Sequence, residues 1–223
     1  MSKYLEALKN EVRGLIQDNE SNPVVEGELP SAIESGIIRL SEVRPRKIIH
    51  DFVGDGSTNI FDLPDTFEDG FSRVFLVEYP FDATGEILAE SINSSRFRLI
   101  EVGDGTWKLR LIDFTPGDTK VLRVQFTASH AVENNSSTIK SRADEKAVVY
   151  WATSECLSIM SAKAVRVGNP LLGSDSVDYQ SRHDKYNALA KYYKGESGLE
   201  NVPAMVHSPV VIKNRYGEQF LTH

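Results

Sequence analysis

Residues 142–167 read RADEKAVVYWATSECLSIMSAKAVRV, and residues 175–195 read DSVDYQSRHDKYNALAKYYKG. The first stretch predicts a helix whose apolar residues cover more than one narrow stripe, so it must be buried on several sides. The Gly-Asn-Pro at 168–170 is typical of a helix end. The second stretch predicts an amphipathic helix that opens near Asp175 and stops at Gly195. Together they predict an αα-hairpin with more apolar surface than one small core needs.

This excess of apolar surface favours a subunit that packs against copies of itself and its neighbours. The large apolar side chains of the hairpin are the candidates for an interface between subunits: Tyr150, Trp151, Leu157, Met160, Tyr179 and Tyr186.

Two shorter helices are expected before the middle of the chain. Apolar residues recur at spacings of three and four over 3–18, which predicts a helix. A second helix is expected to open near Pro30, because proline suits a first helical turn, and to stop before Pro45.

From Lys47 to Ala128 the apolar period changes to two, which predicts antiparallel β-structure with one polar face. Glycine-rich and proline-rich turns at 54–56, 103–105 and 116–118 separate the runs. We expect five to seven strands in a small sandwich or barrel, followed by a polar loop over 131–141.

The expected fold class is α+β. The domains are N-terminal helices over 1–45, an inserted antiparallel β-domain over 46–130, a helical hairpin over 131–196 and an extended C-terminal arm over 197–223. The helical parts are expected to pack together as one four-helix bundle. The arm contains more apolar residues than simple disorder usually has, so we expect it to order against a partner. A frayed terminus is the alternative interpretation. Its candidate contact residues are Val206, Val210, Val211, Ile212, Tyr216 and Phe220.

No catalytic or cofactor motif is present, so an enzyme is not expected and no cofactor or metal is assigned. The five histidines lack ligand spacing, and the single cysteine, Cys156, lies in an apolar helical pattern typical of an inert buried thiol. A weak cation site among the acidic residues of 51–69 stays open beside the simpler interpretation of a solvated acidic rim. Arg39, Arg44, Arg46 and Lys47 form a local basic patch with at most a weak role.

The net charge of −7 disfavours general attraction to nucleic acid or to anionic membranes. No run of residues is apolar and long enough for a membrane span, and the N-terminus lacks the apolar core of a signal peptide. Folding in a reducing cytoplasm is therefore expected.

Several segments, taken in order, resemble the head–tail connector (adaptor) proteins of tailed bacteriophages, in a version with a β-insertion. The resemblance covers roughly residues 30–195, and each segment alone has a plain structural explanation. The segments are RPR at 44–46, DFVGDGS at 51–57, IFDLP at 60–64, FEDGFS at 67–72, VEYP at 77–80, FTASH at 126–130 and DSVDYQS at 175–181.

The resemblance implies a structural virion protein of the neck, assembled in the host cytoplasm. Such adaptors form a ring, commonly of twelve copies, between the portal and the stopper or tail-completion protein. Genomic DNA passes through the channel without specific binding during ejection. In such adaptors the C-terminal arm often docks into the portal. The long arm here also fits a contact with the stopper instead of the portal. Minimal adaptors are mostly helical, so the β-domain here is a departure whose role is open.

Two alternatives remain beside this reading. The chain fits another neck or tail-completion protein, which belongs to the same class. It also fits a β-domain that binds a surface or a carbohydrate on a helical stalk. An exposed aromatic pair would favour the second alternative, although Trp107 alternates into the predicted core.

Overall fold

The computed structural model shows an α+β protein, with four α-helices and antiparallel sheets among the residues that it describes. It describes residues 4–16, 23–84, 89–102, 106–167, 176–203, 210–213 and 219–222. Side chains are described for these ranges except 23–25, 165–167, 176–181, 210–213 and 219–222.

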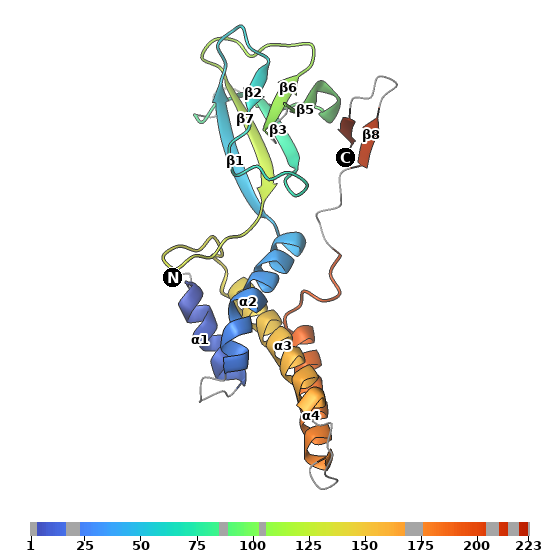
Figure 1. Cartoon of the computed structure of the whole chain (residues 1–223). Coiled ribbons are helices and arrows are strands. Elements are labelled where there is room, and N and C mark those ends of the chain that lie inside the picture. Colours follow the sequence, from blue (N-terminus) through green and yellow to red (C-terminus); the bar gives the residue numbers. More distant parts are fainter. Residues whose placement is uncertain are drawn as a thin grey trace. The chain divides into compact units, whose positions relative to one another are not determined.

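The chain divides into two compact units (Figure 1), each described here by itself. The helical unit contains residues 1–44 and 130–205, and the β-unit contains residues 45–129 and 206–223. The two helical segments, far apart in sequence, therefore fold together.

The helical unit is built around its longest helix. Its helices are α1 (Leu5–Ile16), α2 (Pro23–Val43), α3 (Arg142–Val167) and α4 (Ser176–Glu196). Helix α3 contacts each of the other three, and α4 runs beside it in the opposite direction (Figure 1). The range predicted for α3 is confirmed.

The core of this unit lies where α1 and α2 cover the N-terminal half of α3. It is formed by apolar side chains of all three helices and of the segments before α3 and after α4: Leu8, Val12, Leu29, Ile33, Leu40, Ile139, Val148, Ala152, Cys156 and Leu199. Gly36 lets α2 approach α3 closely, since a Cβ there would lie 3.0 Å from the Val148 carbonyl oxygen.

Helix α2 begins seven residues earlier than the sequence indicated. Pro30 lies inside the helix and not in its first turn. The additional turns are held from outside, because the Arg13 guanidinium of α1 forms a two-pronged contact of 2.6 and 2.8 Å with the Glu26 carboxylate. Tertiary contacts therefore override the proline signal.

The last helix also ends differently from the prediction. Gly195 lies within α4, which continues to Glu196. Gly198 takes the positive φ of 66° that a chain reversal after a helix requires. The predicted helix end at 168–170 lies outside the described residues.

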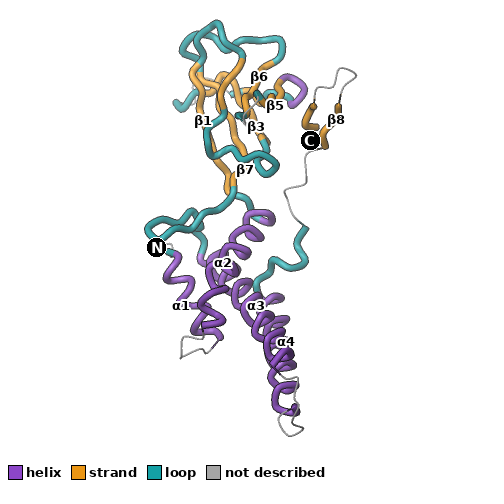
Figure 2. Tube along the Cα trace, viewed as in Figure 1, coloured by secondary structure: helices purple, strands orange, loops and turns teal. Residues whose placement is uncertain are grey.

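The described part of residues 45–129 contains two antiparallel sheets, whose strands are drawn in orange in Figure 2. One has the order β1-β7-β3-β4 and the other β2-β6-β5. The strands are β1 (Arg46–Val53), β2 (Ile60–Asp62), β3 (Val74–Phe81), β4 (Glu90–Ser91), β5 (Phe97–Glu101), β6 (Trp107–Leu111) and β7 (Val121–Ala128), and a 3-10 turn, η1, spans Ser94–Arg96.

One apolar core takes side chains from both sheets. Alternate residues of β7 point into it, with Leu122, Val124 and Phe126 fully buried. On the facing sheet Leu109 and Leu111 of β6 are also fully buried. The period-two prediction for these two strands is confirmed.

The C-terminal segment contains a two-stranded antiparallel hairpin. Strand β8 (Val210–Lys213) pairs with β9 (Gln219–Thr222). Strand β9 lies near β5, and the hairpin groups with the β-unit. This differs from the fully extended arm expected over 197–223.

Candidate assembly surfaces

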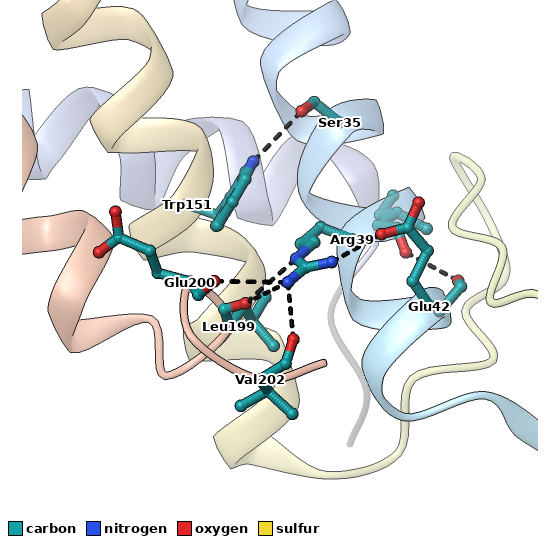
Figure 3. Close-up of polar contacts among 9 residues, drawn as sticks. Ser35, Arg39, Glu42, Trp151, Leu199, Glu200 and Val202 are labelled. Atoms are coloured by element: carbon teal, nitrogen blue, oxygen red, sulfur yellow. Dashed lines mark hydrogen bonds and ion pairs between the residues drawn. The ribbon is translucent and has the colours of Figure 1, made fainter. Parts of the chain in front are cut away.

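Arg39 of α2 fixes the chain where it leaves α4 (Figure 3). Its Nε and Nη2 donate to the Leu199 carbonyl at 3.1 and 2.9 Å, and Nη2 also donates to the Val202 carbonyl at 2.8 Å. Nη1 donates to Glu42 at 2.8 Å. The planar guanidinium suits this arrangement because it presents several donors in a fixed fork. We call the contact of Arg39 with residues 199–202 the Arg39 clasp.

Trp151 lies beside the clasp and joins three helices. Its indole Nε1 donates to the Ser35 hydroxyl of α2 at 3.2 Å (Figure 3). Lys194 of α4 places Nζ 5.1 Å from the indole ring centroid, and the Arg39 Cζ lies 6.0 Å from it. The ring is thus held by contacts within its own chain and remains partly exposed.

A shallow depression of about 330 Å³ runs along α2 beside this indole. Its lining combines an apolar centre with acidic margins: Ser31, Glu34, Ser35, Ile38, Arg39, Glu42 and Trp151. Ile38 is 54% exposed although it lies next to the indole. We call this surface the α2 groove.

Helix α4 exposes a second apolar stripe. Tyr192 is 58% exposed and Leu189 is 36% exposed, whereas Ala190 is buried. The side facing α3 is held partly by His183, whose Nδ1 lies 2.6 Å from the Ser161 hydroxyl oxygen. Together with the exposed Lys185, Leu189 and Tyr192 form the outer face of α4.

The predicted interface residues of the hairpin fall into different environments. Leu157 is only 2% exposed, so contacts within the helical unit already surround it. Tyr150 stacks on Tyr193 at 5.7 Å between ring centroids, and Met160 packs against the core. Tyr186 is half-buried, and the side chain of Tyr179 lies outside the described residues.

The predicted contact residues of the arm are described only as backbone. Ile212 pairs with Phe220, Val211 with Leu221 and Val210 with Thr222. Val206 and Tyr216 lie outside the described residues.

Four of the acidic residues of 51–69, namely Asp51, Asp55, Asp62 and Glu68, have separate partners. Asp51 receives both Arg123 Nε and Nη2 at 2.7 and 2.8 Å, and this bonding lowers its pKa. Asp62 pairs with Lys108 at 2.7 Å. Glu68 accepts from the Ser129 hydroxyl at 2.5 Å. Within the described ranges, no group of three or more potential ligands is arranged to hold a metal ion.

The Gly54–Ser57 loop is a structural turn. The Asp55 carboxylate accepts from the backbone N–H groups of Ser57 and Thr58 at 2.8 and 2.7 Å, and these bonds lower its pKa to about 2. Gly54 packs so closely that a Cβ would lie 2.5 Å from the Gly117 carbonyl oxygen. The Asp55 carboxylate therefore stabilises the turn by accepting backbone hydrogen bonds within it.

Three of the four basic residues that adjoin one another in sequence have separate contacts. Arg39 forms the clasp, and Arg44 pairs with Asp144 of α3 at 2.7 Å. Lys47 of β1 lies over the Phe75 ring at 5.3 Å. Residues 39 and 44 belong to one compact unit and residues 46 and 47 to the other.

Cys156 and His130 both lie in environments that are explained by the fold. Cys156 is buried, and burial raises the pKa of its thiol to about 11. The His130 ring lies 3.0 Å from the Arg44 carbonyl oxygen through Nε2 and 3.4 Å from the Thr138 hydroxyl through Nδ1, so it contacts the loop that follows it. In the part of the chain that the structure describes, no helix has the length and hydropathy of a membrane span.

Comparison of the chain with models of known protein families and with curated protein sequences found no match.

The clasp and the α2 groove were not predicted from the sequence. A backbone carbonyl has no residue signature, so the partners of Arg39 are invisible to pattern analysis. One signal was present, because Glu34, Ile38 and Glu42 share the face of α2 opposite its buried residues.

Proposed function

We propose that this chain is a structural subunit of the head-to-tail connector of a tailed bacteriophage. In this proposal it forms an adaptor ring, commonly of twelve copies, between the portal and the stopper or tail-completion protein. The helical unit is the bundle of the ring wall, and the β-unit is an insertion. Genomic DNA passes through the channel without specific binding.

One observation carries the proposal. The helical unit leaves large apolar side chains in solvent on two different helices, Ile38 on α2 and Leu189 with Tyr192 on α4. Scattered exposed apolar residues are ordinary. Here, however, Ile38 lines the same groove as Trp151, and Leu189 and Tyr192 lie about one turn apart on α4. Such surfaces suit repeated contacts between copies. The order of the resembling segments supplies the assignment to the connector.

The experiment is co-assembly with the portal encoded by the same genome. The isolated chain is expected to be monomeric or weakly associated, and the mixture is expected to give a closed ring of chains on the portal by native mass spectrometry. Imaging the complex counts the copies. A mixture that never co-sediments would refute the connector assignment.

A further inference from the structure

The α2 groove and the outer face of α4 differ in charge and match in spacing. On α2, Glu34 precedes Ile38 by one helical turn. On α4, Lys185 precedes Leu189 by the same four residues, and Tyr192 follows three residues later. Residues four apart are neighbours on one side of a helix. Each helix therefore presents a charged residue followed by an apolar residue, and the charges are opposite.

The charged residues are also available for a new contact. Glu34 and Lys185 are exposed, and among the described side chains no ion pair involves either one. Glu42, at the other margin of the groove, already pairs with Arg39 at 2.8 Å. The carboxylate without an ion pair, that of Glu34, therefore lies on the N-terminal side of Ile38. A helix whose lysine also lies N-terminal to its apolar residue can make both contacts only if it runs parallel to α2.

We propose that the α2 groove of one subunit binds the outer face of α4 of a second copy, with the two helices parallel. Ile38 and Trp151 receive Leu189 and Tyr192, and Glu34 pairs with Lys185 of the neighbour. This inference rests on the proposed function, because it names the partner of the surfaces on which that function depends.

The contact is heterologous, since each subunit uses a different surface on each side. A heterologous contact generates a ring if the rotation closes and an open filament if it does not. Four side chains of this size bury at most roughly several hundred Å², below the roughly 1,200 Å² of a stable interface. A single contact is therefore weak, and closure or a template makes the assembly stable.

Disulfide trapping tests the contact, because oxidation accumulates even weakly populated pairs. Ile38→Cys and Leu189→Cys are made in separate full-length chains. Each alone is expected to give no dimer, and the mixture is expected to give the mixed dimer. Both substitutions in one chain are expected to give a ladder of linked chains. Ile49→Cys, at an exposed site of the β-unit, replaces either partner as the matched control.

Charge exchange tests the direction of the contact. Glu34→Lys is expected to lower the yield of the mixed dimer by roughly threefold to tenfold, since an exposed ion pair is lost and replaced by repulsion. Adding Lys185→Glu to the partner chain is expected to restore the yield. Both substitutions lie at exposed positions, so the melting temperature should stay unchanged.

Three outcomes would overturn the inference: mixed dimers no more abundant than those of the Ile49→Cys control, dimers of either single variant with itself, or no recovery on charge exchange. The connector assignment fails separately. If mixed dimers form but the chain never joins a portal ring, the contact between the α2 groove and α4 is supported and the connector assignment is refuted. If portal rings form without mixed dimers, the connector assignment is supported and the contact between the α2 groove and α4 is refuted.

Discussion

Replacing Arg39 by alanine is expected to destabilise the helical unit by roughly 2–3 kcal/mol. The substitution removes the donors to the partly buried carbonyls of Leu199 and Val202. Each carbonyl left without its donor costs about 1–2 kcal/mol. The loss stays below the sum for two buried groups, because the Arg39 side chain is 21% exposed and water replaces part of the bonding.

The assay follows urea unfolding by the fluorescence of Trp151. The chain has two tryptophans, so a Trp107→Phe background makes Trp151 the reporter of the helical unit alone. This background should be well tolerated, because in the described structure no acceptor bonds the buried Trp107 indole nitrogen. Hydrogen exchange at residues 199–203 checks that the effect is local to the clasp.

Two variants serve as controls. Arg39→Lys keeps the charge but lacks the fork, so it should lose about half as much stability. Arg44→Ala, one residue past the end of α2, removes an ion pair whose arginine is 50% exposed and should cost less than about 1 kcal/mol. If Arg39→Ala and Arg44→Ala have equal effects, the clasp does not stabilise the fold and the reasoning is refuted.

The remaining predictions concern a glycine, a carboxylate and the tail. Gly54→Ala should destabilise the β-unit by roughly 2–3 kcal/mol in urea unfolding followed at Trp107, because the new Cβ meets the backbone of residue 117. In Gly14→Ala the new Cβ of α1 meets open space, so this variant should stabilise the helical unit by up to about 1 kcal/mol. If Gly14→Ala and Gly54→Ala change the free energy of unfolding equally, the close packing at Gly54 does not explain its effect. The folded-state pKa of Asp55, about 2 against its ordinary 3.8, contributes stability above pH 4 that is lost as pH falls toward 2. In Asp55→Asn the free energy of unfolding should depend less on pH between 4 and 2. An unchanged dependence would show that the hydrogen bonds from Ser57 and Thr58 to Asp55 do not stabilise the fold. Deleting residues 204–223 should abolish portal docking while leaving the melting transition at Trp151 unchanged, since the clasp ends at residue 202; a large fall would show that the tail stabilises the helical unit.

The parts of the fold that follow from local periodicity were predictable from the sequence. The 26 residues of α3 appear as a broad apolar run, and the alternation in β7 matches its buried and exposed faces. These signals depend only on neighbours along the chain. The pairing of β1 with β7 does not depend on such neighbours, because its backbone hydrogen bonds join residues 68 to 82 positions apart.

The candidate surfaces were only partly predictable for a related reason. The sequence indicates that α3 is over-apolar, but the structure shows that much of that surface, including Leu157, is filled within the chain. Among the described residues of the helical unit, the exposed large apolar side chains are Tyr4, which precedes α1, Ile38 of α2, and Leu189 and Tyr192 of α4. Which face of an amphipathic helix stays in solvent depends on every element packed around it, and no single stretch of sequence contains that information.

The clasp has a consequence for how the chain tolerates change. The hydrogen bonds given for Arg39 with residues 199–202 all go to main-chain carbonyl oxygens. The exit of the polypeptide from the helical unit is therefore insensitive to the identity of Glu200 and Asn201. A foreign domain grafted after Pro203 would leave from the same point, so the helical unit is a natural acceptor for exchanged C-terminal modules.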